Sequence, residues 1–312
     1  MAVSKKTTLR ELLSQGQVFA PCIFDCISAR AVELSGFKAT LLSGGALAYS
    51  LCGVPDMGLL SADEVIWATS RISDYSPLPL IVDGDDGYGE GPIQTYRFVH
   101  RIAKAGAMAI SIDDSTGIRG WERQFQKDRP PHRVVEQDIW LSKIKAALKA
   151  SAGTDCMIIA RTEAMFSRGF DEAVERVVKA RELGAEMTLV MGLKTLEQGI
   201  KVAEKDPGWK MWPDVSVTDG HSDVELADID KLGFNLVTMH YTEKGAMFGM
   251  IDYGMHTIKD RNTVYIDEHD FDGLLPGKDH HTLFSFHKKW LPMEDEFNDL
   301  AGIADKPDSV EY

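Results

Sequence analysis

Residues 93–112 read IQTYRFVHRIAKAGAMAISI and contain one complete unit of the fold. The first part, Ile93–Lys104, has apolar side chains at helical spacing, and the Ala-Gly pair that follows is typical of a helix end. Ala107–Ile112 is a short apolar run of the kind that forms a buried strand. The stretch therefore predicts a helix that leads through a glycine turn into a strand.

The same unit recurs along most of the chain. Helical segments end at Gly36, Gly184 and Gly233, and a short apolar segment follows each of these glycines. Strict alternation implies parallel strands with right-handed crossovers, and about eight units favour a closed (β/α)8 TIM barrel over an open doubly wound sheet. The predicted strands are Val18–Ile23, Ala39–Ser43, Leu78–Asp83, Ala107–Ile112, Cys156–Arg161, Glu186–Met191, Asp214–Thr218 and Asn235–His240.

The alternation stops near Thr257, which predicts two domains. The first is a catalytic barrel over residues 1–256, and the second is a C-terminal helical extension over residues 257–312. The extension contains a helix rich in Phe and Trp at His280–Glu296, which the barrel does not need for its own core. We expect such an apolar segment to pack on a neighbouring subunit.

The composition excludes several classes of protein. The 312 residues include 34 Lys and Arg against 48 Asp and Glu, a formal net charge of −14. Such an acidic chain is not a general nucleic-acid binder and offers no broad basic surface to anionic lipid. It contains no apolar run of the roughly 20 residues that span a bilayer, and no signal-peptide pattern. We therefore expect a cytoplasmic protein without nucleic-acid or membrane partners.

Acidic side chains gather at the strand ends, where barrels of this class place their functional groups. Asp83, Asp85 and Asp113 follow the third and fourth strands, and Asp56 lies in the loop after the second. So many like charges repel one another unless a cation or protonation relieves them. Oxygen ligands without Cys or His suit Mg²⁺, with Mn²⁺ as an alternative. The other interpretation is that these aspartates cap helices or lie in a solvated turn.

Two further features of the same rim can bind an anion. Ser43, Gly44 and Gly45 end the second strand, where backbone N–H groups and one hydroxyl can face a carboxylate. A tight turn that needs small residues explains the same three residues equally well. Arg161 ends the fifth strand, so its charge must meet an anion, either a substrate carboxylate or a partner such as Glu163.

Three more side chains complete the set of candidates. His240 ends the eighth predicted strand, where it is either an acid/base group or a packing residue. Tyr88 follows the aspartate-rich turn and is a candidate to hold a proton-donating water. Thr218 ends the seventh predicted strand and is a candidate for substrate binding.

Several motifs, in order along residues 9–250, resemble the isocitrate lyase/phosphoenolpyruvate mutase superfamily. They are Asp25-x-x-Ser28-Ala-Arg30, Ser43-Gly-Gly, Gly53-Val-Pro-Asp56-Met-Gly-Leu, Asp83-Gly-Asp85-Asp-Gly-Tyr-Gly, Ile112-Asp113-Asp114 and Ile158-Ile-Ala-Arg161-Thr-Glu-Ala. The resemblance implies a (β/α)8 barrel, Mg²⁺, a small anionic 2-oxo or 2-hydroxy acid as substrate, and a homotetramer with an exchanged C-terminal helix.

The resemblance also implies roles for the candidate residues. Asp83 and Asp85 match the metal-shell aspartates, Asp56 matches an outer metal-shell group, and Asp113 stands where the family usually has Glu. Arg161 matches the substrate arginine, and the Ser-Gly-Gly turn matches the carboxylate cradle, at Ser43, Gly44 and Gly45.

The loop after the fourth strand departs from the family pattern. The carbon–carbon lyases carry a Lys-(Lys/Arg)-Cys-Gly-His loop whose Cys is the acid/base group, whereas Trp121–His132 contains no Cys. The Lys with Asn-Ser of the phosphonate mutases is absent too, and Met191-Gly192 stands where isocitrate-type lyases have Glu. Val217–Gly220 and His240 are closer to the oxaloacetate decarboxylase branch, which lacks the Cys loop and has a His after strand eight.

The sequence thus predicts a Mg²⁺-dependent lyase that cleaves a C–C bond next to a 2-oxo acid carboxylate, with oxaloacetate decarboxylation as the leading case. Arg161 and the Ser-Gly-Gly amides would hold the substrate, and His240 or a water near Tyr88 would supply the proton. One alternative is a retro-aldol lyase of a 2-alkylmalate or methylisocitrate-like acid, with Lys127 or His132 in place of the Cys. The others are a phosphonopyruvate mutase or hydrolase, and a non-catalytic barrel that binds a dicarboxylate.

Overall fold

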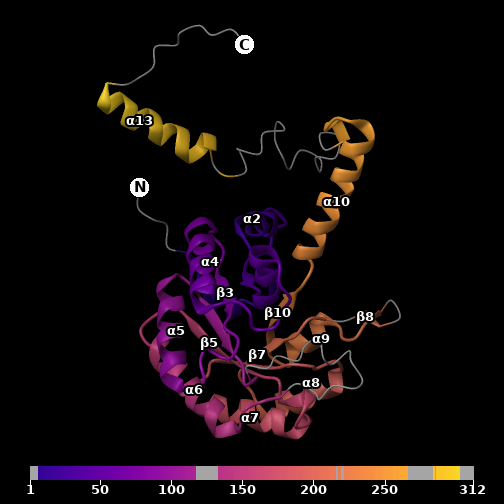
Figure 1. Ribbon diagram of the computed structural model, residues 1–312. Coiled ribbons are helices and arrows are strands. Elements are labelled where there is room, and N and C mark those ends of the chain that lie inside the picture. The colour runs from indigo at the N-terminus through magenta and orange to yellow at the C-terminus, as the bar shows by residue number, and fades with distance from the viewer. Residues whose placement is uncertain are drawn as a thin grey trace. The chain divides into compact units, whose positions relative to one another are not determined.

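Eight parallel strands close into a barrel in the computed structural model, which describes residues 6–116, 133–215, 217–218, 221–265, 284 and 286–302. The order around the barrel is β1-β10-β7-β6-β5-β4-β3-β2, so the predicted (β/α)8 barrel is confirmed (Figure 1). The barrel strands are β1 (Val18–Ile23), β2 (Thr40–Leu42), β3 (Leu80–Asp83), β4 (Ala109–Ile112), β5 (Met157–Thr162), β6 (Met187–Val190), β7 (Trp209–Trp212) and β10 (Phe234–Met239).

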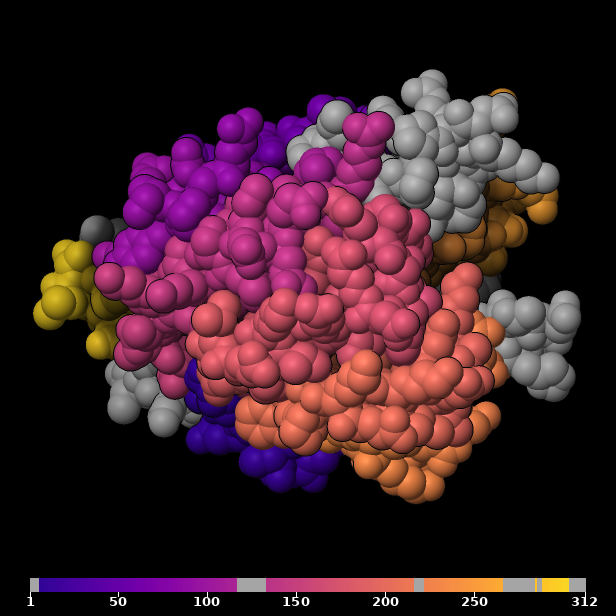
Figure 2. Space-filling model, turned by 90° about the horizontal axis from the view of Figure 1, so that it is seen from below, coloured from indigo at the N-terminus to yellow at the C-terminus, as the bar shows by residue number. Residues whose placement is uncertain are grey.

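Helices alternate with these strands and cover the outside of the barrel. Figure 2 shows the face over which the helices from α6 to α9, coloured magenta to orange, form the surface. The helical elements of the barrel are α1 (Leu9–Leu13), α2 (Cys26–Leu34), α3 (Gly44–Leu47), the π-helix η1 (Ala48–Cys52), α4 (Ala62–Tyr75), α5 (Pro92–Lys104), α6 (Gln137–Ser151), the 3-10 helix η3 (Ala164–Phe166), α7 (Phe170–Glu182), α8 (Leu196–Lys205) and α9 (Leu226–Lys231).

Local sequence signals explain where several helices begin. Ser61 caps α4 in a capping box, because its hydroxyl accepts from the Glu64 N–H while the Glu64 carboxylate accepts from the Ser61 N–H at 2.6 Å. α1 and α8 begin with the same arrangement at Thr8 and Thr195. An N-cap of this kind contributes about 1 kcal/mol to helix stability.

The seventh barrel strand is Trp209–Trp212, so the prediction of Asp214–Thr218 is wrong. The sequence analysis did not predict this strand, because a lysine interrupts the apolar run Trp-Lys-Met-Trp. Lys210 is only 1% exposed, and its ammonium donates to the carbonyl oxygens of Asp206 at 2.8 Å and of Gly208 at 2.7 Å. Burial lowers the pKa of Lys210 to about 8, while the charge of Asp206 opposes that shift.

The segment that was predicted as the seventh strand has two other roles. Asp214 lies just beyond the C-terminal end of β7, at the rim of the barrel. β8 (Val217–Thr218) then pairs antiparallel with β9 (His221–Ser222) in a separate two-stranded sheet.

The apolar core has two layers. One cluster, which includes Ala20, Cys22, Ile81 and Leu236, fills the barrel interior, and α1 closes that cluster with Leu9 and Leu13. The other cluster lies between the strands and the surrounding helices and contains large side chains such as Trp140, Trp212 and Phe234. Alternate residues of each strand therefore point inward, which decides which polar residues reach the site.

The chain divides into two compact units, Met1–Gly245 and Ala246–Tyr312. α10 (Thr242–Asp260) begins in the first unit, and the π-helix η6 (Phe286–Trp290) and α13 (Leu291–Ala301) belong to the second. The predicted domain boundary after residue 256 falls within α10 and stays a prediction. Among the described helices, none has the length and apolarity needed to cross a membrane.

Asp206 tests how much a buried charge contributes at the N-terminal end of the barrel. Its fully buried carboxylate accepts from Arg181 Nε at 2.7 Å and from the Thr188 hydroxyl. We expect Asp206→Ala to lower the free energy of unfolding by about 3–5 kcal/mol in urea denaturation, because it leaves a cation without its counter-charge. Glu197→Ala, which breaks an exposed helical pair with Lys201, is the control and should cost below about 1 kcal/mol. Equal costs for the two variants would contradict this account.

Candidate active site

Three side chains meet inside the C-terminal end of the barrel. By the alternation along each strand, Asp83 on β3, Ser111 on β4 and Arg161 on β5 point inward. Asp83 Oδ1 accepts from Ser111 Oγ at 3.2 Å and pairs with Arg161 Nη1, also at 3.2 Å. The structure therefore brings together two of the predicted site residues, Asp83 and Arg161.

The Gly44-Gly45 turn lies against three of the candidate carboxylates. A Cβ atom on Gly44 would lie 3.4 Å from Asp85 Oδ1 and 3.6 Å from Asp83 Oδ2. A Cβ atom on Gly45 would lie 3.1 Å from Asp56 Oδ2. The turn therefore gathers Asp56, Asp83 and Asp85 around one short stretch of backbone, as the sequence analysis predicted for a common rim.

Ser43 begins the short helix α3 that carries these glycines. Its hydroxyl accepts from the Ala46 N–H at 3.2 Å, so Ser43 is the N-cap of α3. This capping is the turn interpretation of the Ser-Gly-Gly motif, and it places the start of α3 beside the candidate carboxylates. The same turn can therefore serve both interpretations.

Asp113 is buried and holds its own turn. Its Oδ1 accepts from Ser115 N at 2.9 Å and from Ser115 Oγ at 2.5 Å. Its backbone N–H donates to the Asp85 carbonyl oxygen at 2.7 Å, which ties the end of β4 to the aspartate-rich turn. Asp113 thus holds a buried turn at the end of β4, which is neither the helix cap nor the solvated turn that the sequence analysis gave as the alternative to metal binding.

The carboxylates around the Gly44-Gly45 turn are the candidate ligands for Mg²⁺. In the part of the chain that the structure describes, no three His, Cys, Asp or Glu side chains are already spaced to hold a metal ion together. The donors are all carboxylate oxygens, and Mg²⁺ typically keeps several waters and takes only one or two carboxylates directly. This donor set therefore fits a hydrated Mg²⁺ that Asp83 or Asp85 would bind and Asp56 would reach through water.

The turn between β3 and α5 has an unusual backbone. Asp85 and Tyr88 have positive φ values of 49° and 54°, which side chains other than glycine rarely adopt. The buried Lys143 of α6 supports the turn, because its ammonium donates to the Asp86 carbonyl oxygen at 2.9 Å. The ring of Tyr88 packs against Phe98 of α5, with 4.6 Å between centroids, in the layer between strands and helices.

Arg161 is held in place by two carboxylates. Its Nε and Nη2 atoms lie 2.7 Å and 2.5 Å from Glu163 Oε1, and its Nη1 contacts Asp83. The Arg161 side chain is only 11% exposed, so its charge interacts mostly with groups inside the barrel. The structure thus shows the pairing with Glu163 that the sequence left open. The guanidinium of Arg161 also contacts Asp83, a candidate metal ligand.

A buried ion pair behind Arg161 was missed by the sequence analysis. Asp114 Oδ1 accepts from the Glu163 N–H at 2.7 Å, and its Oδ2 accepts from Thr162 Oγ1 and from Arg176 Nη1 at 3.0 Å. Burial raises the pKa of Asp114 to about 6, although the hydrogen bonds from Glu163 and Thr162 act in the other direction. The only signal in the sequence was an arginine on the face of α7 that is otherwise apolar.

His240 has partners at both ring nitrogens. Nδ1 contacts Asp214, and Nε2 lies 3.1 Å from the sulfur of Cys22. Burial acts to lower the pKa of His240, but the hydrogen bond and charge of Asp214 outweigh it and raise that pKa above its ordinary value. The sequence analysis placed Asp214 within a predicted strand and gave no role to Cys22, which lies within the first predicted strand, so it missed this group.

One sequence candidate is placed only in part, and two lie outside the described residues. The structure describes the backbone of Thr218 in β8, outside the barrel sheet, and not its side chain. Its predicted substrate contact therefore stays a prediction. Lys127 and His132, the two candidates to replace the family Cys, lie outside the described residues.

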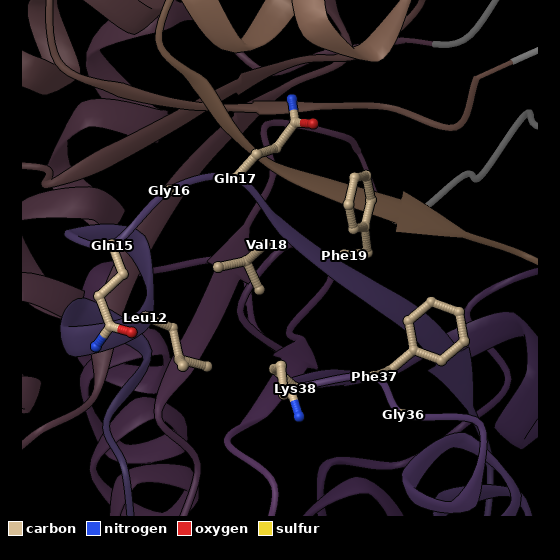
Figure 3. Close-up of a pocket in the computed structure, with 9 residues that line it drawn as sticks. All are labelled: Leu12, Gln15, Gly16, Gln17, Val18, Phe19, Gly36, Phe37 and Lys38. Carbon is tan, nitrogen blue, oxygen red and sulfur yellow. The ribbon is translucent and has the colours of Figure 1, made fainter.

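A cavity of about 240 Å³ lies at the opposite end of the barrel from these residues (Figure 3). It is lined by the start of β1, at Val18 and Phe19, and by Phe37 and Lys38 before β2. Functional groups of such barrels lie at the C-terminal strand ends, so we do not assign this cavity to the active site.

The family of the chain follows from a match over most of the barrel. The family model described as phosphoenolpyruvate phosphomutase matches residues 9–258. The chain belongs to this family. The family lies within the isocitrate lyase/phosphoenolpyruvate mutase superfamily, as the sequence motifs predicted.

Relatives of this family member include several that are named as enzymes and one that is named as a petal death protein. The petal death protein of Dianthus caryophyllus is 29% identical over 311 residues, 97% of this chain and 93% of that protein. An oxaloacetate decarboxylase of Paraburkholderia xenovorans (strain LB400) is 31% identical over 196 residues, 62% of this chain and 64% of that protein. A crystal structure of 2,3-dimethylmalate lyase superposes with a TM-score of 0.77 at 25% identity, over 100% of both chains. The relatives that are named as enzymes act on small organic acids.

Gly84 tests the close packing that positions Asp83 and Asp85. Its N–H donates to the Ser111 carbonyl oxygen at 3.0 Å, and a Cβ atom would lie 2.5 Å from the same oxygen. We expect Gly84→Ala to lower the free energy of unfolding by about 1–3 kcal/mol, because β3 and β4 must separate. The control is Gly245→Ala in α10, where an added Cβ atom would meet no described residue within 4 Å beyond its chain neighbours and the helix backbone, and where alanine favours the helix. Equal stability of the two variants in urea denaturation would argue against this packing.

Proposed function

We propose that the protein is a Mg²⁺-dependent lyase that cleaves the C–C bond next to a 2-oxo acid carboxylate, with oxaloacetate decarboxylation as its leading reaction. The observation that carries this proposal is the meeting of Asp83 with Arg161 beside the Gly44-Gly45 turn. A metal cation bound by the carboxylates would then lie on one side of a bound substrate, and the guanidinium of Arg161 would lie on the other. That combination suits a small dianion better than a neutral ligand.

The candidate residues would have separate roles in binding the metal and the substrate. Mg²⁺ would be held by Asp83 and Asp85, with Asp56 in the outer shell and Asp113, which stands at the place of the family Glu, as a further candidate ligand. When bound it supplies a Lewis acid for the 2-oxo group. Arg161 would bind the substrate carboxylate through its planar fork, while Glu163 keeps the guanidinium oriented.

Decarboxylation places few demands on the rest of the site. It needs stabilisation of the negative charge that develops on the 2-oxo oxygen, and afterwards one proton at the carbon that lost CO₂. The first N–H groups of α3, at Gly44 and Gly45, would hold the charged oxygens. His240 would supply the proton. A loop without the family Cys is consistent with this reaction, because no base is needed at the leaving carbon.

A second reaction is favoured by one comparison. The crystal structure of 2,3-dimethylmalate lyase superposes over the whole chain, and in sequence a 2,3-dimethylmalate lyase matches 73% of it at 29% identity, as much as an oxaloacetate decarboxylase does. Retro-aldol cleavage of a 2-alkylmalate or methylisocitrate-like acid is therefore the alternative. It would require an acid/base group in the place of the family Cys, such as Lys127 or His132.

We also propose that the chain works as a homotetramer with an exchanged C-terminal helix. α10 exposes Met247, Phe248 and Ile258, and α13 exposes Phe297 and Leu300. Apolar side chains on two helices of one unit support a subunit interface at this part of the chain.

An assay of 2-oxo and 2-hydroxy dicarboxylates, with Mg²⁺ and with EDTA, tests the proposed reaction. We expect oxaloacetate to give CO₂ and pyruvate, EDTA to abolish this turnover and Mg²⁺ to restore it. Asp85→Ala should lower kcat/KM by about 100-fold or more, because it removes a carboxylate from the metal shell. Asp228→Ala, which breaks an exposed pair with Lys231 on α9, is the control and should keep full activity.

Two outcomes would contradict this assignment. One is oxaloacetate turnover that neither EDTA nor Asp85→Ala reduces. The other is release of an oxo acid from a 2-alkylmalate without CO₂ from oxaloacetate, which would establish the retro-aldol alternative instead.

A further inference from the structure

Three side chains from three separate segments form a hydrogen-bonded line at the rim of the barrel. Asp214 follows β7, His240 follows β10, and Cys22 lies near the end of β1. Asp214 contacts Nδ1 of His240, and the sulfur of Cys22 lies 3.1 Å from Nε2. Thr242 joins the line to the start of α10, because its hydroxyl donates to the Cys22 carbonyl oxygen.

We propose that Asp214 and Cys22 are positioning residues that hold His240 with its transferable proton on Nε2. This inference rests on the proposed function, because it names the residues that prepare His240 to protonate the carbon that loses CO₂. It assigns roles to two residues for which the family motifs in this chain gave none.

The two contacts of the His240 ring differ in strength. A hydrogen bond from Nδ1 to a carboxylate is charge-assisted and is about twice as strong as a neutral one. A thiol sulfur is only a weak acceptor. The hydrogen bond between Nδ1 and Asp214 therefore fixes the orientation of the ring. The hydrogen bond from Nε2 to the sulfur of Cys22 is weak, so little free energy is lost when the Nε2 proton is transferred. The hydrogen bond at one ring nitrogen decides the chemistry of the other.

The charges that face His240 favour the imidazolium form. Asp214 contacts the ring, and Glu243 of α10 and Asp83 of β3 add negative charge, so together they outweigh burial and raise the pKa of His240. Burial, with those same carboxylates, raises the pKa of the Cys22 thiol well above its ordinary value. Cys22 therefore stays a neutral thiol, so Asp214 is the negatively charged group that contacts the ring.

The proton transfer balances without a further reactant. The Nε2–H bond of the imidazolium breaks as the C–H bond forms at the enolate carbon. The imidazole is left neutral, with Nδ1–H on Asp214. His240 is 42% exposed, so water can return the proton to Nε2 before the next turnover.

The chain offers a matched control pair on α10. His256 Nδ1 lies 3.6 Å from Asp260 Oδ2, one helical turn further along, and both side chains are partly exposed. This second His–Asp pair lies outside the candidate site. Asp260→Asn therefore changes the same kind of contact without touching His240.

The direct test is an NMR pH titration of the ring nitrogens of His240 in the full-length protein, together with the pH dependence of kcat/KM. The active imidazolium is present below the pKa of His240 and is lost as the pH rises through it. Asp214→Asn should move both the His240 midpoint and the basic limb of the rate profile to lower pH, and should lower kcat by about 10-fold or more. Asp214→Glu should restore part of both changes, and Asp260→Asn should change neither.

Cys22→Ala separates the roles of the two partners. We expect it to keep the His240 midpoint above that of Asp214→Asn, because the carboxylate sets the charge of the ring, and to change the chemical shift of Nε2. A shift of the midpoint as large as that of Asp214→Asn would show that the anchored nitrogen has been assigned wrongly.

These experiments distinguish a wrong positioning role from a wrong proposed function. A His240 midpoint that is unmoved in Asp214→Asn overturns the positioning role, whatever reaction the enzyme catalyses. Absence of turnover on every 2-oxo acid in the unmodified protein overturns the proposed function, while the titration still reports on the ring.

Discussion

The contact between Arg161 and Asp83 inside the closed barrel is the interaction on which the rest of the site depends. An arginine side chain that is only 11% exposed needs anionic partners, and Asp83 and Glu163 provide them. Glu163 is in turn fixed by Asp114, whose carboxylate the buried Arg176 holds. Ion pairs and one backbone hydrogen bond therefore connect these charged groups, which a substrate anion and a cation would join together.

A large part of the fold could be predicted from the sequence. Alternating apolar runs and glycine-terminated helices predicted seven of the eight barrel strands near their observed positions. The seventh was misplaced, because Lys210 interrupts the apolar pattern of Trp209–Trp212. Its ammonium is satisfied by the carbonyl oxygens of Asp206 and Gly208, four and two residues earlier, and the apolar pattern gives no sign of these bonds.

The candidate site was predictable where short motifs follow strands. Asp83, Asp85 and Arg161 end or follow strands that were recognised, so their common rim could be inferred. Asp214 was missed because its strand was misplaced. Cys22 was missed because a buried cysteine in a strand is usually a packing residue, and only the fold shows that a histidine from the last strand lies 3.1 Å from its sulfur.

The central claim is that a cation and Arg161 bind the same small dianion. Calorimetric titration of the full-length protein with oxalate, a dicarboxylate that cannot turn over by decarboxylation, tests this claim most directly. We predict binding in the presence of Mg²⁺ that weakens by about 10-fold or more in EDTA, and by a similar factor in Arg161→Met with Mg²⁺ present. Oxalate affinity that is the same with and without Mg²⁺ would contradict the claim.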